Sequence, residues 1–469
     1  MTRPTLHRSL LLPAMLGLAA PGSAAAQVPP DEAWRTLETE HFRITFPERL
    51  GDLAARTGVV AEQAHEALSA GFRAGPGATI DIVLTDHVDV SNGYARVSPS
   101  NRVVLYARPP PDHLALGYFD DWLEQLVVHE LAHVFHLDYT GWFGRFFRAL
   151  FGRLPSFLTF PGTNVPGWVI EGLATWYESA LTPGGRVHGT YHEMVLRTAA
   201  LEGRFESLGT AGGYSPQWPG GGRRYVYGSL FFEYLLDKHG RDVMAEFVED
   251  LARNASLPGR VLDDVSLTSE WDAWREEMRS RVERLDDELA AFGPVTEPEA
   301  LTSGARQALH PAVSPDGGRL VYVRSDGRSD PRLVAMPPAG GDASTLARTN
   351  HLTRFDFLPD GGIVFSQREF TDRYRHYSDV YVLAGGGTVR RVTEGARVAA
   401  PSAGPDGGWA VAVMDGGGTN GLVRVDLGNG ALEEIVAPAE DTYWAWPAAS
   451  PDGRWIAASR WAEGRHDVV

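Results

Sequence analysis

The pattern of apolar and polar positions divides the chain into regions with different periodicities. Apolar and polar residues alternate over 42–46, which is typical of a half-buried strand. A helix is predicted over 50–70, followed by strands over 79–84 and 102–107. Residues 27–110 are therefore expected to form a small mixed α/β layer.

Helical periodicity dominates the next region, residues 111–294. Apolar residues recur there at spacings of three and four. The predicted helical segments are 118–138, 143–154, 169–181, 225–238, 243–252 and 270–292. We expect 27–110 and 111–294 to make up one domain, 27–294.

Beyond residue 294, short apolar strands alternate with turns rich in Gly and Pro, and one turn recurs. Its Pro-Asp-Gly aspartates are Asp316, Asp360, Asp406 and Asp452, at intervals of 44, 46 and 46 residues. Each turn precedes an apolar strand, as expected for one four-stranded propeller blade per repeat. The alternative is four unrelated hairpins in one β-rich domain, but the fixed period favours repeats.

These repeats resemble those of TolB-like propellers, which implies an all-β propeller over 295–469. With the mixed α/β and helical domain before it, the whole chain is expected to be of the α+β class. Propellers typically close with about four to eight blades. The fourth repeat stops at Val469, where a third strand would just begin. We expect the propeller to be incomplete and the chain to be a fragment, because an open sheet edge invites aggregation.

The N-terminus predicts export. Residues 1–26 read as a signal peptide, with basic residues before an apolar run over 10–20 and three alanines before Gln27. A membrane anchor is the alternative, but a span needs about 20 apolar residues. We therefore expect a periplasmic or secreted protein. The chain has no cysteine, so a metal site must use histidine and carboxylate ligands.

Composition and charge narrow the class of partner. With 43% hydrophobic residues and 13 Trp, 15 Tyr and 20 Phe, the chain has enough apolar groups to fold. The formal net charge of −17 argues against nucleic acid, whose binders carry excess Lys and Arg.

The strongest chemical signal is His129-Glu130-Leu131-Ala132-His133 within a predicted helix. Residues four apart stand one turn above each other, so His129 and His133 can share one metal ion. Glu130 lies about 100° round the helix, where it can reach a water without being a ligand. The alternative is a solvated helix with two spaced histidines. Its apolar stripe is expected to pack on the side opposite the histidines, which would face a cleft.

A second predicted helix, just after Pro166 and Gly167, carries Glu171-Gly172-Leu173-Ala174 and Glu178. Together with the first motif, this stretch resembles the gluzincin peptidases. The resemblance implies one Zn²⁺ per chain with Glu171 as third ligand, and Glu178 as a partner of a histidine ligand. The alternatives are a carboxylate stabilised by the helix dipole for Glu171 and a solvated acid for Glu178.

The resemblance also implies a hydrolytic mechanism in which a tyrosine assists. Zinc would lower the pKa of a water to about 7, Glu130 would accept its proton, and the leaving amine would receive it. A tyrosine beyond the third ligand would assist the oxyanion; Tyr225 is our choice, with Tyr227 as the alternative, and both could instead pack a helix start. Aminopeptidases of this type carry a Gly-Ala-Met-Glu-Asn stretch, which is absent here, so an endopeptidase is expected.

Residues 142–160 combine aromatic residues at helical spacing with interleaved arginines. We expect this aromatic face to cover the core between the two ligand helices. The alternative is a peripheral membrane contact or a lid over a hydrophobic substrate.

The sequence thus predicts an exported zinc-dependent endopeptidase acting on peptides or proteins, with a propeller that binds substrate or a protein partner. One alternative is an inactive peptidase-like protein whose propeller is a binding module. Another is a hydrolase of other bonds that uses the same zinc chemistry.

Overall fold

The computed structural model describes residues 29–110, 116–214, 217–254, 260–261, 265–294, 296–304, 306–352 and 354–469. The signal peptide predicted at 1–26 lies outside these residues.

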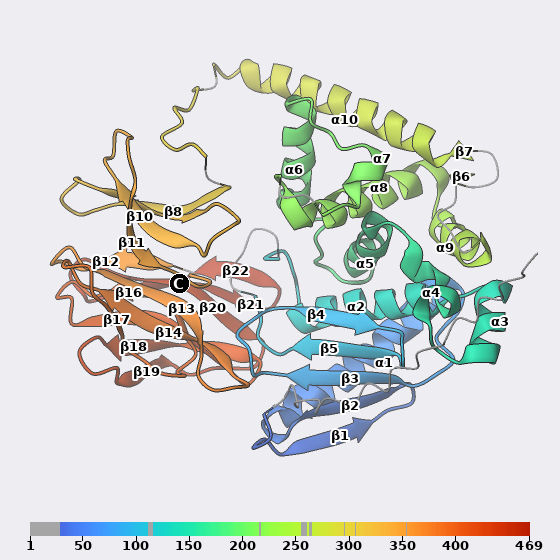
Figure 1. Cartoon of the computed structure of the whole chain (residues 1–469), viewed down its shortest axis with the longest axis horizontal. Helices are drawn as coiled ribbons and strands as arrows, with labels where there is room; N and C mark the ends of the chain where they lie inside the picture. The colour runs from blue at the N-terminus through green and yellow to red at the C-terminus, as the bar shows by residue number, and fades with distance from the viewer. Residues whose placement is uncertain are drawn as a thin grey trace, which may run out of the picture.

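The N-terminal part is built on a five-stranded sheet with the order β1-β2-β3-β5-β4. The strands are β1 (Trp34–Glu38), β2 (Phe42–Pro47), β3 (Ile80–Thr85), β4 (Gly93–Arg96) and β5 (Arg102–Tyr106). The three central strands are parallel, and both edge strands pair antiparallel. Helices α1 (Gly51–Phe72) and α2 (Trp122–Asp138) pack side by side on this sheet (Figure 1). The predicted α/β layer is therefore present, whereas the short edge strands β1 and β4 were not predicted.

The remaining helices are α3 (Trp142–Phe151), α4 (Ser156–Thr159), α5 (Gly167–Leu181), α6 (Thr190–Leu201), α7 (Leu208–Ala211), α8 (Arg223–His239), α9 (Val243–Asn254) and α10 (Leu267–Ala290). Most of them lie above α2 in Figure 1, and α3 lies at the right edge of the view. Short 3-10 turns cover Glu48–Leu50, Pro161–Asn164 and Gly220–Gly222, and β6 (Arg260–Val261) pairs with β7 (Val265–Ser266). Each predicted helix is present with shifted ends; α6, after a Gly-rich turn, was not predicted.

The helix that carries His129 and His133, α2, begins later than predicted. Residues 118–121 are not helical, because Asp121 is the N-cap of α2 and its carboxylate accepts the backbone N–H groups of Leu123 and Glu124. One face of this helix borders a cavity, as expected, since His129 and His133 line it. The helix is nevertheless enclosed, because every residue from Trp122 to His136 except Glu124 is buried.

The prediction that the aromatic face of 142–160 covers the core is wrong. Gly144 is the one buried residue of α3, and large apolar side chains of this helix face outward. The core is formed instead by residues of other helices, among them Trp168 of α5 and Phe231 of α8, which contact each other.

The C-terminal part forms a four-blade propeller-like arrangement, with consecutive antiparallel sheets of four, four, four and three strands. The strands are β8 (Gln307–Val313), β9 (Leu320–Ser325), β10 (Arg332–Met336), β11 (Ser344–Arg348), β12 (Phe355–Phe357), β13 (Ile363–Phe370), β14 (His376–Leu383), β15 (Val389–Arg391), β16 (Val398–Ala403), β17 (Trp409–Gly416), β18 (Thr419–Asp426), β19 (Leu432–Val436), β20 (Thr442–Ala449), β21 (Ile456–Ala462) and β22 (Arg465–Val468). One blade per repeat is therefore confirmed.

The repeated turn joins the first and second strands of every blade. Each aspartate carboxylate accepts a backbone N–H two residues on, at Gly318, Gly362, Gly408 and Arg454. The glycine after each aspartate has φ between 69° and 81°, a left-handed conformation that other residues rarely adopt. The Pro-Asp-Gly signal thus marks a turn that requires its residue types.

Buried ion pairs join the sheet domain to the propeller. Arg397 binds both Asp86 carboxylate oxygens at 2.7 and 2.8 Å and Asp89 Oδ1 at 2.8 Å. Arg108 Nε donates to Asp415 Oδ2 at 2.7 Å, and both side chains are at most 9% exposed. The three sheet-domain residues follow β3 and β5, so the carboxyl ends of these parallel strands face the propeller.

We expect Arg108→Ala to lower the free energy of unfolding by about 3–5 kcal/mol, because it leaves the Asp415 carboxylate buried without its cation. Chemical denaturation followed by tryptophan fluorescence measures this change. The control is Arg35→Ala, which breaks an exposed pair with Glu48 and should cost at most about 1 kcal/mol. Equal effects of the two substitutions would contradict a tightly joined interface.

Candidate metal centre

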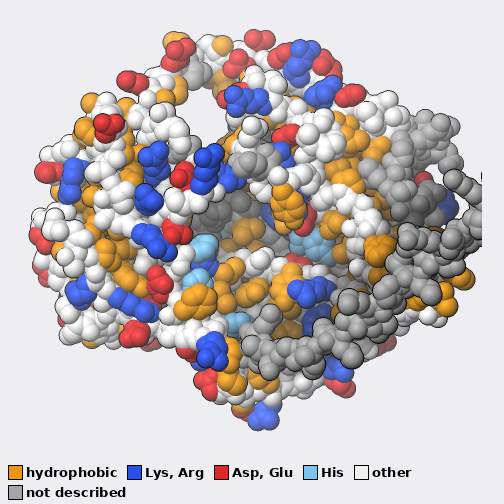
Figure 2. All heavy atoms as spheres, viewed as in Figure 1, with side chains coloured by type: hydrophobic (Ala, Val, Ile, Leu, Met, Phe, Trp, Pro, Cys, Tyr) orange, Lys and Arg blue, Asp and Glu red, His pale blue; other side chains and the backbone are white. Residues whose placement is uncertain are grey.

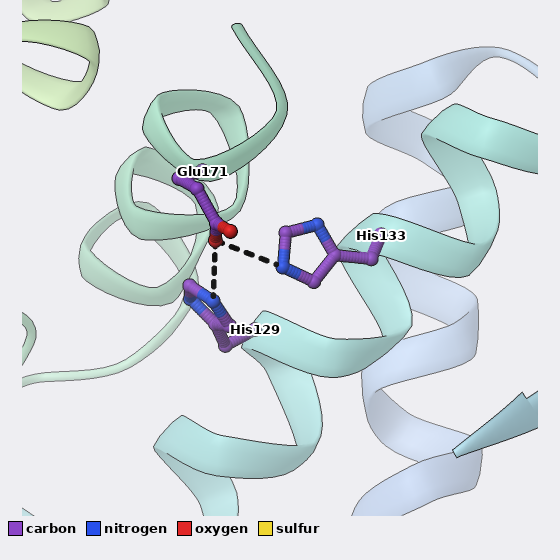
Figure 3. A group of neighbouring side chains, drawn as sticks. All are labelled: His129, His133 and Glu171. Atoms are coloured by element: carbon purple, nitrogen blue, oxygen red, sulfur yellow. Dashed lines mark ion pairs between the residues drawn. The ribbon is translucent and has the colours of Figure 1, made fainter. Parts of the chain in front are cut away.

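Two crossing helices bring together three side chains that can bind a metal. His129 and His133 project from α2, and Glu171 projects from the second turn of α5 (Figure 3). Glu171 Oε2 lies 3.3 Å from His133 Nε2 and 3.8 Å from His129 Nε2. One ligand atom from each residue falls within 4.8 Å of the others.

This arrangement fits zinc. Two ligand atoms bound tetrahedrally at about 2.0–2.1 Å from one zinc ion lie about 3.3 Å apart, close to the separations between Glu171 and the imidazoles. The donor set of two imidazoles and one carboxylate, with no thiolate, is one that catalytic zinc uses. The two Nε2 atoms turned toward Glu171 are therefore placed to share an ion with its carboxylate.

Glu178 orients the first histidine. Its Oε2 lies 2.9 Å from His129 Nδ1, and the helical spacing of seven residues places it two turns after Glu171. With the Nδ1 proton donated to Glu178, Nε2 is left with a free lone pair for a metal. Glu178 is itself buried, so its charge needs a cation nearby.

That cation is Arg186, which the sequence analysis did not identify. Its Nε and Nη2 donate to the two Glu178 oxygens at 2.7 Å each, and its backbone N–H donates to Oε1 at 3.1 Å. Arg186 Nη2 also lies 3.0 Å from His129 Nδ1. Arg186 Nη2 and a protonated His129 Nδ1 are both donors, so they do not bond to each other. Glu178, not His129, therefore fixes the position of Arg186.

The turn before Arg186 explains why this residue reaches back to α5. Gly185 has φ of 99°, and a Cβ at this position would lie 2.4 Å from Ser179. A residue with a side chain would therefore be both strained and obstructed there.

The electrostatics of the centre favour ionised carboxylates. Burial alone would raise the pKa of both Glu171 and Glu178. Hydrogen bonds with His129 and His133 lower the pKa of Glu171 instead. Arg186 and His129 lower the pKa of Glu178 to about 2. Burial alone would lower the pKa of His129, but hydrogen bonds with Glu171 and Glu178 raise it to about 9.

Glu130 differs from the other carboxylates of the cavity. It is buried, and its Oε2 has no hydrogen-bond partner among the described residues. Burial raises its pKa, opposed by His133 and His129. The side chain lies against Gly93 of the edge strand β4, where a Cβ would come within 2.8 Å of Glu130 Oε1. A raised pKa and an unpaired oxygen are features of a group that exchanges protons.

The two candidate tyrosines point in different directions from α8. Tyr225 lines the cavity, its ring lies 6.3 Å from that of His129, and the Arg186 guanidinium lies 4.9 Å from its centre. Burial raises the pKa of Tyr225, so its hydroxyl stays protonated at neutral pH. Tyr227 is fully buried and stacks on Trp271 in the core. The structure therefore brings Tyr225, not Tyr227, to the centre.

A close crossing of α5 and α8 sets the position of Tyr225. A Cβ on Gly172 would lie 2.4 Å from the Gly228 backbone, and one on Gly228 would clash with the Trp168 carbonyl. The two helices can approach this closely only with glycine at both positions. Glu171 and Tyr225, one on each of these helices, thereby line the same cavity.

The cavity around the centre has a volume of about 550 Å³. Its walls come from α2, α5, α8 and the edge strand β4, with Arg186, His192 and Tyr191 at one side. Figure 2 shows this face of the molecule hollowed near its middle, with histidine side chains along the hollow. Arg186 and His192 belong to no sequence motif, so the sequence alone gives no signal that they line this cavity.

Comparison with known proteins gives limited similarity. No family model matches the chain. An uncharacterised protein of Treponema pallidum (strain Nichols) is 24% identical over 327 residues, which cover 69% of this chain. This chain spans 28% of the length of that relative.

Solved structures match the propeller part. A structure described as TolB from Agrobacterium tumefaciens covers 35% of this chain and 59% of its own, with 20% identity and a TM-score of 0.31. TolB from Acinetobacter baumannii covers 34% and 40%, with 23% identity and a TM-score of 0.30. The propeller-like arrangement is established by the strand order of the four sheets and their repeated turns.

Proposed function

We propose that the chain is an exported zinc-dependent metallopeptidase that hydrolyses peptide bonds, as the gluzincin-like motifs imply. The observation that supports it most is the convergence of His129, His133 and Glu171 beside a buried Glu130 whose Oε2 is unpaired among the described residues. A structural zinc site would have four protein ligands and no base beside it. Three ligands with a neighbouring base are the pattern of hydrolytic zinc sites.

The residues divide the chemistry among them. A bound zinc ion supplies Lewis acidity and lowers the pKa of a water molecule to about 7. Glu130 accepts the proton of the attacking water and delivers it to the leaving amine. The Tyr225 hydroxyl donates a hydrogen bond to the developing oxyanion. Glu178, fixed by Arg186, holds His129 in the tautomer that binds metal.

The cavity favours an endopeptidase over an aminopeptidase. Among the described residues that line it, the carboxylates are Glu130, Glu171 and Glu178. The first is the proposed base, the second the proposed ligand, and the third is bound to Arg186. None of these remains to bind the positively charged amino terminus of a substrate.

We further propose that the propeller binds the protein substrate or a protein partner. Its fourth blade adjoins the catalytic part, where Phe119 contacts Tyr443 and Trp461. The alternative function, an inactive peptidase-like domain with a binding propeller, would need a missing ligand or base. Because candidates for all of these residues are present, the enzyme is the better supported of the two.

The test is metal content and proteolysis of the purified protein. We expect about one zinc ion per chain, cleavage of casein, loss of cleavage after chelation, and its recovery when zinc is restored. Mass spectrometry of the products would show internal cleavage sites. Protein that binds no zinc, or cleavage that survives full removal of zinc, would refute the proposal.

A further inference from the structure

A cluster of large apolar side chains is exposed on α3 and the segment after it. We call it the α3 patch; its members are 52–66% exposed and comprise Trp142, Phe146, Leu150, Phe151, Leu154 and Phe157. Soluble proteins seldom expose so many large apolar groups together unless the surface binds something. The patch is separate from the metal centre, so its role does not depend on the proposed peptidase activity.

The patch is a property of the helix as a whole. Trp142, Phe146 and Leu150 are spaced by four residues and form one outward stripe, while Gly144 faces inward. The helix packs mainly on α4 and α9. The side chains of its apolar stripe are 58–66% exposed, so no other described element covers them.

The charge of this segment is opposite to that of the protein. The chain carries a net charge of −17, yet residues 139–170 contain three arginines and no acidic residue or lysine. Arg148 and Arg153 bind backbone carbonyl groups and Asp138, which keeps them beside the helix. Arg145 is exposed on the flank of the apolar stripe.

We propose that the α3 patch docks on an anionic lipid membrane, with α3 lying in the plane of the headgroups. Aromatic and aliphatic side chains on one helix face with arginine at the flank are the pattern of interfacial helices, and Trp favours the interface. None of the helices in the described part of the chain has the length and apolarity to span a bilayer. With 10 residues, α3 itself is shorter than the about 20 that a span needs, so its proposed contact is peripheral.

The charge pattern favours lipid over a second copy of this chain. Arg148 and Arg153 are already paired with Asp138, but Arg145 has no ion pair among the described residues. A symmetric dimer through the α3 patch would bring the two copies of Arg145 together. Anionic headgroups would instead offset its charge. In Figure 1, α3 lies at one end of the molecule and the propeller at the other, so docking leaves the propeller clear of the membrane.

Flotation with lipid vesicles tests the proposal. We expect the full chain to float with vesicles of phosphatidylcholine and phosphatidylglycerol, and more weakly with phosphatidylcholine alone. Phe146→Glu combined with Leu150→Glu should lower the partition coefficient by about tenfold or more, because two apolar side chains that would enter the lipid become charged. Arg145→Glu should weaken binding to the anionic vesicles only.

The control is Leu201→Glu combined with Leu289→Glu, which changes two equally exposed leucines on α6 and α10 and should leave binding unchanged. All variants keep the same N-terminal residues, so any binding by that segment is common to them, and near-UV circular dichroism shows that each is folded. The proposal would be overturned if the variant with Phe146→Glu and Leu150→Glu floated like wild type. It would also be overturned if the wild-type protein bound neither kind of vesicle. Patch-dependent dimers in sedimentation without vesicle binding would also overturn it, in favour of a second copy.

Discussion

Glu130→Gln is expected to keep its zinc and to lose peptide hydrolysis by about 10²–10⁴-fold, the usual contribution of a general base. The amide has nearly the shape of the carboxylate but cannot accept the proton of the attacking water. The metal should stay because Glu130 is not one of the three converging residues. Metal analysis and kcat/KM for casein-derived peptides measure the two outcomes on one sample.

The control for Glu130→Gln is Glu124→Gln, on the same helix but near its N-terminus and outside the cavity. It should change neither zinc content nor kcat/KM. If Glu130→Gln released the zinc, Glu130 would be a ligand rather than a base. If it cleaved peptides like wild type, hydrolysis would use another base.

The elements that could be predicted from the sequence are those set by local periodicity. The pair at His129 and His133 depends only on the pitch of one helix, so its geometry follows from the motif. The propeller repeats are similarly local, because the turn at each aspartate is closed by a backbone bond two residues away. Neither needs knowledge of the tertiary structure.

The features that could not be predicted depend on contacts between distant segments. Arg186 reaches Glu178 through a turn at Gly185, and Gly93 lies against Glu130 only because β4 pairs with β5. The choice of Tyr225 depends on how closely α5 and α8 cross. Nothing in the residue pattern of one segment reports the position of the other.

The wrong expectation for α3 has a similar cause. Helical spacing of aromatic residues predicts an apolar face, but it cannot show whether the protein itself covers that face. Here α3 turns its small residue, Gly144, inward and its large residues outward. The excess of arginine over acidic residues in 139–170 is visible in the sequence. It indicates better than helical spacing what the exposed face of α3 binds.

Glu171→Ala should lose both zinc and hydrolysis, which distinguishes a ligand from a base. The side chain is 18% exposed at the cavity wall, so its truncation should leave the fold intact. Zinc affinity should fall well beyond the about 10–100-fold that loss of an outer partner typically costs, and Glu178→Gln should show that smaller loss. Competition with a fluorescent zinc chelator measures both affinities against wild type. If Glu171→Ala bound zinc as tightly as Glu178→Gln, the third ligand would lie elsewhere, because two imidazoles alone cannot hold the ion as a three-ligand site does.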